Sequence, residues 1–284
     1  MTTILETLNK SYQDLYNQNI KTAKIDSEII LAEVLKVSRL NLITKQNTSI
    51  NRDQQNLYNS LIERRKKNEP VAYILNKKEF WNESYFVDQR VLIPRPETEV
   101  IIEMLLKKIN NKSKPFCILD IGCGSGCLLI SCLQELRRSK GVGVDISSAA
   151  LEVAHININQ NQLGSRAKLI KQDLFKLNVK KKFDIILSNP PYLTDINYTK
   201  LESDVKNYEP KMALVGGVDG LKFYKKIISI ASASLNKNGF LGLEMGDRHY
   251  KEIKKFLFAN SFKIIDKFKL INGEIRCILA MKIS

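Results

Sequence analysis

Apolar residues recur about every 3.6 positions through the first 75 residues of the chain, which is the spacing of one helical face. The period is clear over residues 4–15, 25–35 and 57–62. Asp26 or Ser27 is expected to cap the second of these helices, with Glu28 in its first turn. The pattern predicts a bundle of packed helices. Such a domain either binds a partner or only packs on its neighbour.

The pattern changes over residues 71–93, where β-branched and aromatic residues are separated by polar turns. This composition is typical of short strands, and we expect a hairpin or connector here. Pro94 and Pro96 follow, too close together to lie inside a helix, although Pro96 can begin one. Helical spacing resumes over residues 100–105.

From residue 116 onward, short apolar runs alternate with stretches of helical period. The expected strands are residues 116–121, 141–145, 168–172, 183–188 and 240–244, and the expected helices between them include 149–161 and 221–235. Nearly continuous apolar strands are covered by helices on both faces. The alternation therefore predicts a doubly wound α/β sheet. Two final strands joined at Asn272-Gly273, a dipeptide that favours tight hairpins, predict an antiparallel edge.

Composition adds limits to this picture. The chain has 284 residues, 44% hydrophobic and 26% charged, which are ordinary globular values and exclude a disordered or fibrous chain. No apolar run approaches the ~20 residues of a membrane-spanning helix, and the N-terminus does not resemble a signal peptide. We therefore expect a cytoplasmic protein without a membrane partner. The net charge of +15 suits a nucleic-acid or ribonucleoprotein partner, or reflects a general enrichment in lysine.

The cysteines are expected to be small core residues. They are Cys117, Cys123, Cys127, Cys132 and Cys277. Their spacing contains no Cys-x-x-Cys pair, and the two histidines, His155 and His249, lie far from most of them in sequence. We therefore expect neither a disulfide framework nor a metal site.

A glycine-rich turn follows the first strand of the predicted sheet. The residues expected to form a ligand site here are Asp120, Gly122, Cys123, Gly124, Ser125 and Gly126. Glycines let the backbone bend sharply and let a ligand approach it closely. The third glycine of a dinucleotide fingerprint would fall on Cys127, and the carboxylate of Asp120 would repel a pyrophosphate. The turn therefore favours a cationic or hydroxyl-bearing ligand over NAD.

Two more acids follow the next two predicted strands. Asp145, 19 residues after Gly126, can accept hydrogen bonds from both ribose hydroxyls. Asp173 can accept from an adenine amine, with Leu174 and Phe175 against the base. Each acid alone could be a helix cap. Together, at the carboxyl ends of consecutive strands, they predict S-adenosylmethionine as the cofactor.

The fourth predicted strand ends in Ser188-Asn189-Pro190-Pro191-Tyr192. The Asn189 side-chain carbonyl and the Pro190 backbone carbonyl could both accept from one planar NH2 group, with Tyr192 against its plane. Asn189, Pro190 and Tyr192 are therefore the candidate catalytic residues, Pro191 completes the acceptor site, and Asn189 is also expected to border the cofactor. Positioning of the nitrogen favours its attack on a methyl group. The motif predicts an N-methyltransferase, and leaves adenine, cytosine and glutamine open as acceptors.

The motif set as a whole resembles the HemK/PrmC family, the N5-glutamine methyltransferases of peptide chain release factors. The segments are PVAYILNKKEFW (70–81), RVLIPRPETE (90–99), ILDIGCGSG (118–126), SNPPY (188–192) and YEPKMALVGGVDGLKFY (208–224), with Arg64-Arg65 upstream. SNPPY is shared with adenine-N6 DNA methyltransferases, whereas PRPETE and YEP…GGxDGL point to this family. Asn76 stands where a glycine is common and His249 where a glutamine is usual, and neither is expected to touch these motifs.

The resemblance implies a helical N-terminal, substrate-recognition domain (1–75), a β-hairpin connector (76–93) and a seven-stranded, Rossmann-like class I methyltransferase domain (94–284). It implies methyl transfer from S-adenosylmethionine to the glutamine of the Gly-Gly-Gln (GGQ) loop of class I bacterial release factors. Arg95 to Glu99 would border the pocket. The alternative is an adenine-N6 methyltransferase acting on nucleic acid. No separate target-recognition domain is evident, so no stable nucleic-acid partner is expected.

Overall fold

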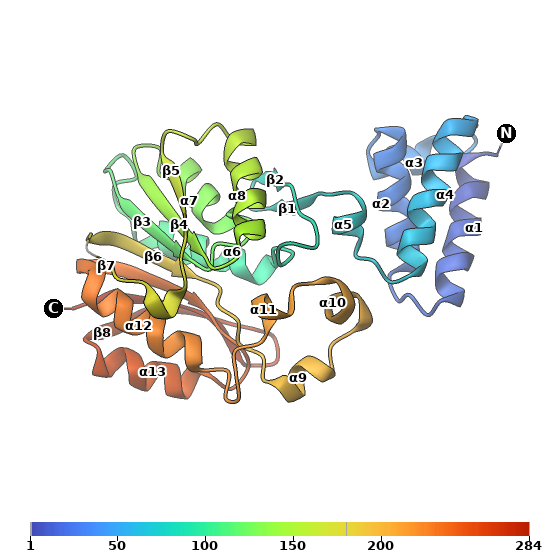
Figure 1. The fold of residues 1–284 in the computed structure, drawn as a ribbon. Coiled ribbons are helices and arrows are strands. Elements are labelled where there is room, and N and C mark those ends of the chain that lie inside the picture. Colours follow the sequence, from blue (N-terminus) through green and yellow to red (C-terminus); the bar gives the residue numbers. More distant parts are fainter. Residues whose placement is uncertain (1, 180, 284) are drawn as a thin grey trace. The chain divides into compact units, whose positions relative to one another are not determined.

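The structure is a computed structural model that describes residues 2–179 and 181–283. The chain divides into two compact units, one of Met1–Lys77 with Glu202–Tyr208 and one of Lys78–Leu201 with Glu209–Ser284. Each unit has hydrophobic core residues of its own. Figure 1 labels the elements of both units.

The first unit is helical, which confirms the expectation for the N-terminal region. Its helices are α1 (Ile4–Asn17), α2 (Ala23–Leu35), α3 (Arg39–Thr44), α4 (Arg52–Lys66), α5 (Val71–Ile74) and, from the later segment, α10 (Ser203–Tyr208). Thr3 and Asn51 begin α1 and α4 with capping boxes that satisfy backbone N–H groups at the helix starts. The apolar faces bury Leu15, Ile30 and Leu31 in the core of this unit.

Two local expectations in this unit are wrong. Neither Asp26 nor Ser27 caps the second helix, because α2 begins at Ala23 and both side chains are buried within the helix. Val71–Ile74 forms the short helix α5 rather than a strand. The carbonyl of Pro70 accepts from two backbone N–H groups of this helix, so the local turn outweighs the β preference of the side chains.

Asp26 instead forms a buried ion pair with Arg65. The Arg65 Nε atom donates to Asp26 Oδ2 at 2.7 Å, and the two side chains are 7% and 9% exposed. Thr22 Oγ1 donates to the same carboxylate oxygen at 2.6 Å. The pair joins α2 to α4, and loss of one partner would leave the other charge buried and unpaired.

We expect Asp26→Asn to lower the free energy of unfolding of the helical unit by about 3–5 kcal/mol. The control, Glu63→Gln, breaks the more exposed pair that Glu63 forms with Lys66, and should cost less than about 1 kcal/mol. Urea unfolding, with hydrogen exchange of the amides in α2 and α4, measures both changes. Equal losses in the two variants would contradict a special role for the buried pair.

The second unit is built on a seven-stranded sheet in the order β5-β4-β3-β6-β7-β9-β8. Its strands are β3 (Cys117–Ile121), β4 (Lys140–Asp145), β5 (Ala167–Lys171), β6 (Phe183–Ser188), β7 (Leu235–Glu244), β8 (Phe262–Lys269) and β9 (Ile275–Lys282). β9 pairs antiparallel with both β7 and β8, and the other neighbours are parallel. This confirms the doubly wound sheet and its antiparallel edge. A separate hairpin of β1 (Lys78–Phe80) and β2 (Glu83–Tyr85) precedes the sheet.

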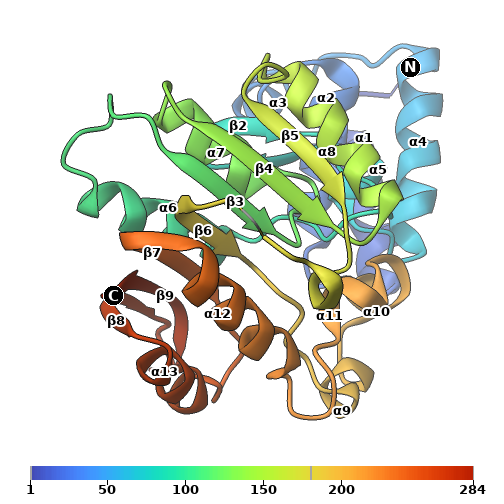
Figure 2. The same ribbon diagram turned by 60° about the vertical axis from the view of Figure 1, so that its left-hand side comes forward.

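Helices cover both faces of the sheet. Side chains of α6 (Pro96–Lys108), α7 (Cys127–Glu135) and α8 (Ser148–Gln160) pack in one core cluster, and those of α12 (Lys222–Ser234) and α13 (Tyr250–Ala259) pack in the other. Figure 2 shows α12 and α13 together on one face. Shorter helices are η1 (Leu174–Lys176), α9 (Asp195–Thr199) and α11 (Lys211–Leu214).

The cysteines occupy the core positions expected of them. Cys123, Cys127, Cys132 and Cys277 are buried, and Cys117 is half-buried. Among residues 2–179 and 181–283, no helix is both long and apolar enough to cross a membrane.

Candidate active site

A cavity of about 390 Å³ lies at the carboxyl ends of β3, β4, β5 and β6. Ligands of open α/β sheets bind at this edge. Its lining includes most of the residues expected to bind cofactor or acceptor, namely Asp120, Gly122, Cys123, Gly124, Ser125, Asp145, Asp173, Leu174, Asn189, Pro190 and Pro191. Gly126 and Tyr192 are not among the lining residues.

The glycine turn is joined to the end of β4 by hydrogen bonds. The N–H groups of Gly122 and Cys123 donate to the Val144 carbonyl at 2.8 and 3.1 Å. Gly124 N–H donates to Asp145 Oδ2 at 3.0 Å. Burial raises the pKa of the Asp145 carboxyl above its ordinary value, although the backbone N–H groups of Ser147, Gly124 and Ile146 oppose that rise. The turn and the acid therefore form one preorganised wall of the cavity.

Gly126 has a structural reason to be glycine. Its φ is +80°, and it precedes the first turn of α7. An added Cβ would lie 3.3 Å from Ile130 and 3.4 Å from Ala154, tighter than ordinary packing. The third glycine thus lets α7 begin close to α8, and it shapes the turn without lining the cavity.

Asp120 is the most unusual group of the site. It is the penultimate residue of β3, with 1% of its surface exposed, and neither carboxylate oxygen makes a regular hydrogen bond among the described residues. Burial raises the pKa of Asp120 to about 7; the backbone N–H of Leu129 opposes this rise, and the charge of Asp145 adds to it. A buried carboxylate without a donor is costly unless a ligand pairs with it. Because Asp120 lines the cavity, its chemistry fits a ligand that carries positive charge.

Asp173 lies in the turn that follows β5, where it already caps the short helix η1. Its Oδ1 accepts from Phe175 N–H at 2.8 Å and so begins η1. Phe175 also lines the cavity, and its ring centroid is 5.6 Å from that of Phe223. Capping and ligand binding are compatible here, because a carboxylate has lone pairs beyond the one that the cap uses.

The Asn-Pro-Pro-Tyr turn is attached to its surroundings from behind. Ser188 Oγ donates to the Ile121 carbonyl at 2.7 Å, which joins the ends of β6 and β3. Asn189 Nδ2 donates to Thr98 Oγ1 at 3.1 Å. The Tyr192 hydroxyl donates to Glu244 Oε1 at 3.4 Å. The Asn189 side chain is thus held through the NH2 end of its amide.

The motif segments that carry the family resemblance converge on this turn. Arg95 Nη2 donates to the buried Glu209 carboxylate, which also accepts from Ile93 N–H at 3.1 Å. An added Cβ on Gly216 would lie 2.6 Å from the Pro191 carbonyl oxygen, so only glycine fits there. PRPETE and YEP are therefore linked by an ion pair, and the GGxDGL segment packs directly against the proline pair.

One expectation about the two departures from the family pattern is wrong. An added Cβ on Gly220 would lie 2.6 Å from the His249 ring, so His249 does contact the GGxDGL segment. It lies there because the turn after β7 places it beside Tyr224, with ring centroids 6.0 Å apart. Asn76 has a φ of +51°, the left-handed region that favours glycine and that asparagine tolerates.

Residue-by-residue reasoning missed Glu244, Glu209 and Arg276 and gave Thr98 no role of its own. Burial raises the pKa of Glu244 to about 7, and its carboxylate accepts from both Thr98 and Tyr192. Arg276 Nη1 donates to the Tyr192 hydroxyl at 3.3 Å. A signal for Glu244 was present, since it is another acid at the carboxyl end of a predicted strand.

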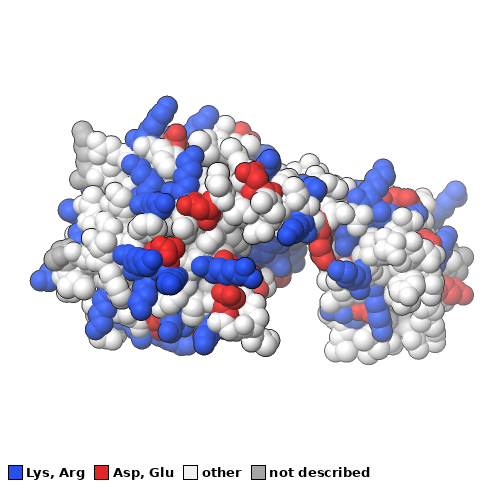
Figure 3. Space-filling view, turned by 90° about the horizontal axis from the view of Figure 1, so that it is seen from below, with Lys and Arg blue, Asp and Glu red and all other residues white. Residues whose placement is uncertain are grey.

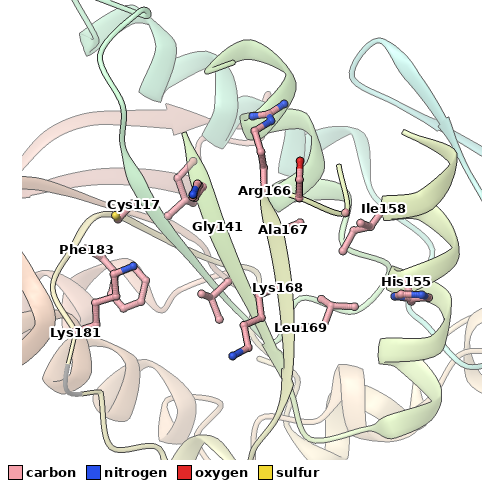
Figure 4. A pocket seen from close by; sticks show the side chains of 15 residues that line it. Cys117, Gly141, His155, Ile158, Arg166, Ala167, Lys168, Leu169, Lys181 and Phe183 are labelled. Carbon is pink, nitrogen blue, oxygen red and sulfur yellow. The ribbon is translucent and has the colours of Figure 1, made fainter. Parts of the chain in front are cut away.

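A second, larger cavity of about 560 Å³ lies at the opposite ends of the strands (Figure 4). It is bordered by the first residues of β3 and β4 and by Arg166, Lys168 and Lys181. Arg166 has a structural role, because its Nη1 donates to the backbone carbonyls of Leu133 and Ser139 at 2.8 and 3.2 Å. None of the residues expected to bind the cofactor or the acceptor lines this cavity.

Comparisons with known proteins agree with this geometry. The methyltransferase small domain matches residues 97–204, and the PrmC N-terminal domain matches residues 6–75. A solved structure of T. thermophilus 16S rRNA N2 G1207 methyltransferase, in complex with AdoMet and guanosine, has a TM-score of 0.50 at 18% identity. It covers 72% of this chain and 49% of its own. At that identity the likeness concerns the fold alone, and it confirms the class I methyltransferase fold.

Two relatives are similar over nearly the whole chain. A release factor glutamine methyltransferase of Fusobacterium nucleatum is 36% identical over 280 residues, 98% of this chain and 78% of the relative. A protein of the same name from Clostridium acetobutylicum is 36% identical over 282 residues, 98% of each chain. Both alignments extend over nearly the whole chain, and the chain therefore belongs to the family of release factor glutamine methyltransferases.

Proposed function

We propose that this protein transfers a methyl group from S-adenosylmethionine to the side-chain amide nitrogen (N5) of a glutamine. The substrate would be the GGQ motif of class I bacterial peptide chain release factors, and the reaction would modulate translation termination. The observation that carries the proposal is the placement of Asn189 and the proline pair on the same cavity as Asp120 and the glycine turn. The names of the full-length relatives supply the acceptor.

The residues that line the cavity suit this cofactor in charge and hydrogen-bonding capacity. Asp120 borders the cavity, and its buried carboxylate, whose oxygens make no regular hydrogen bond, would favour a positively charged group there. Asp145 would hold the ribose hydroxyls, and Asp173 with Leu174 would hold the adenine. When bound, S-adenosylmethionine supplies an electrophilic methyl group on its sulfonium. The glycine turn, from Gly122 to Gly126, would let the cofactor lie close to the backbone.

The acceptor amide would be held by the Asn-Pro-Pro-Tyr turn. The NH2 group of Asn189 donates a hydrogen bond to Thr98, so the Asn189 carbonyl oxygen remains as an acceptor for the substrate NH2 group. Pro190 would offer its backbone carbonyl to the second hydrogen, and Tyr192 and Pro191 would complete the site. An amide nitrogen is a weak nucleophile, so the contribution of these residues is orientation toward the methyl group.

We further propose a division of labour along the chain. Residues 1–75 would recognise the release factor, and residues 94–284 would bind the cofactor and catalyse methyl transfer. Residues 76–93 would connect these two domains. The match of the PrmC N-terminal domain to residues 6–75 supports a separate first part. Because the proposed substrate is a translation factor, the proposed compartment is the cytoplasm.

The decisive experiment uses purified protein with S-adenosylmethionine that carries a labelled methyl group. The acceptors are a recombinant release factor, the same factor with the GGQ glutamine changed to alanine, and duplex DNA. We expect label in the intact factor only. Label in the alanine variant would contradict the proposed site, and label in DNA would favour adenine methylation.

The alternative, an adenine-N6 methyltransferase acting on nucleic acid, rests on the Asn-Pro-Pro-Tyr turn and on the net charge of +15. The full-length relatives do not favour it. On the face shown in Figure 3, lysine and arginine side chains are scattered among acidic ones and do not form one continuous basic band. A stable nucleic-acid partner is therefore not part of the proposal.

Asp145→Ala is expected to weaken S-adenosylmethionine binding by about 1.5–3 kcal/mol, the scale of a lost hydrogen bond to a charged group. The variant also removes the acceptor for Gly124 N–H, so the glycine turn loses its attachment to β4. Isothermal titration calorimetry measures the affinity. Glu103→Ala, an exposed acid on α6 whose partner Lys107 does not line the cavity, is the control. Equal affinities for the Asp145 variant and the wild type would contradict the ribose assignment.

A further inference from the structure

Thr98 lines the cavity beside Asn189, whereas Glu244 does not line it, and together these two residues connect to both ends of the Asn-Pro-Pro-Tyr turn. Asn189 Nδ2 donates to Thr98 Oγ1 at 3.1 Å, and Thr98 Oγ1 donates to Glu244 Oε2. The other oxygen of the same carboxylate accepts from the Tyr192 hydroxyl at 3.4 Å. Arg276 Nη1 in turn donates to that hydroxyl at 3.3 Å. A single carboxylate therefore terminates two hydrogen-bond chains, one from each end of the turn.

The direction of these chains follows from the inventory of hydrogens. An ionised carboxylate only accepts, and a hydroxyl has one hydrogen to donate. The Thr98 hydroxyl donates its one hydrogen to Glu244, so toward Asn189 it can only accept. The Asn189 amide must then present its NH2 group to Thr98, and its carbonyl oxygen is left free. With the amide turned the other way, the Asn189 carbonyl would face a lone pair of Thr98.

We propose that Thr98 and Glu244 are positioning residues that fix which end of the Asn189 amide faces the acceptor. The proposal rests on the proposed function, in which the Asn189 carbonyl accepts from the substrate NH2 group. An inverted Asn189 would present its own NH2 group to the substrate NH2 group, and two donors repel. The carboxylate therefore acts through Thr98 and touches neither substrate nor cofactor.

Burial makes this orientation firm. Thr98 and Glu244 are only 2% and 1% exposed, so water does not compete for their hydrogen bonds. Burial also raises the pKa of Glu244 to about 7. Above that pH the carboxylate only accepts, whereas below it the protonated group can donate to Thr98 and free the Thr98 hydrogen for the Asn189 carbonyl. The other groups that act on Glu244 are Arg276 and Arg95, which favour its ionised form, Glu97, which opposes it, and the neighbouring Cys277 thiol.

The first test reads the Asn189 amide directly and does not depend on turnover. Protein with 15N-labelled asparagine is titrated from pH 5.5 to 8.5, and the Asn189 NH2 signal is assigned by its absence in Asn189→Ala. We expect this signal to titrate with a midpoint near 7 in the wild type and to lose most of that titration in Glu244→Gln but not in Asp120→Asn, which removes the other carboxyl of the site with a pKa of about 7. In Thr98→Val the Asn189 signal should likewise no longer respond to the titration of Glu244. Unchanged titration in both variants would overturn the proposal.

The second test is kinetic and uses the intact release factor with saturating S-adenosylmethionine. Thr98→Val should lower kcat about 10- to 100-fold, the scale of a misplaced reacting group, with cofactor affinity within about twofold of the wild type. Thr98→Ser keeps the hydroxyl and should retain activity within about threefold. Glu252→Gln, an acid of the surface pair with Lys255, is the charge control for Glu244→Gln.

A double-mutant cycle separates positioning from general damage. If Thr98 acts through Asn189, then Thr98→Val/Asn189→Ala should be no slower than Asn189→Ala alone. Fully additive losses, or equal losses in Thr98→Ser and Thr98→Val, would overturn the positioning role. A wild-type protein that does not methylate the release factor would overturn the proposed function instead, and the amide titration would still decide the Thr98–Glu244 link.

Discussion

Asn189→Ala is expected to lower kcat by about 100- to 1,000-fold, the range for loss of one preorganised hydrogen-bonding group in an active site. Affinity for S-adenosylmethionine should stay within about threefold, because Asp120, Asp145 and the glycine turn are untouched. The physical reason is the loss of the carbonyl that orients the acceptor nitrogen, while Thr98 and Glu244 remain in place behind it.

Calorimetry with the cofactor and single-turnover methylation of the release factor measure the two effects separately. Asn159→Ala, an exposed asparagine on α8, is the control and should leave both quantities unchanged. Equal losses of cofactor affinity and of rate in Asn189→Ala would mean that Asn189 mainly holds the cofactor. The proposed acceptor site would then be wrong.

Much of the fold was predictable because local patterns specify it. Strands buried on both faces must be short apolar runs, and β3, β4, β5 and β6 each lie within two residues of the predicted limits. The cavity was predictable for the same reason, since the carboxyl ends of neighbouring parallel strands meet at one edge. Asp120 and Asp145 therefore come together on the lining, as expected from sequence.

What could not be predicted depends on contacts between distant residues. Thr98 and Glu244 are 146 positions apart and share no local motif, so nothing in the sequence says that they meet behind Asn189. Asp26 looks like a helix cap locally, and only the approach of Arg65 from α4 gives it another role. The grouping of Glu202–Tyr208 with the helical unit likewise follows from tertiary packing alone.

Asp120→Asn is expected to weaken S-adenosylmethionine binding about 10- to 100-fold at pH 8, through the lost charge-assisted pairing of a cationic ligand. In the same variant, the cofactor-free protein should become more stable by about 1–3 kcal/mol at pH 8. Both changes have one cause. Asp120 is a fully buried carboxylate whose oxygens make no regular hydrogen bond, and the nearby Leu129 N–H offsets the cost of its burial only in part, so its charge destabilises the empty fold and is best compensated by a cation in the cavity.

The pH dependence tests that cause. The folded pKa of Asp120, about 7, lies above its value in the unfolded chain, about 3.9. The folded protein therefore holds the proton over this interval, and the stability of the cofactor-free protein falls as pH rises from about 4 to 7. Glu244 contributes a slope of the same sign, so Asp120→Asn should remove only part of it.

Cofactor affinity should change in the opposite direction and rise with pH through 7, because a cation binds the ionised carboxylate, and this rise should vanish in the variant. Thermal unfolding at pH 4, 5, 6 and 7 measures the slope of stability, and calorimetry at pH 6, 7 and 8 measures the slope of cofactor affinity. A less stable variant with unchanged cofactor affinity would show that the Asp120 charge is satisfied within the fold and is not directed at a ligand.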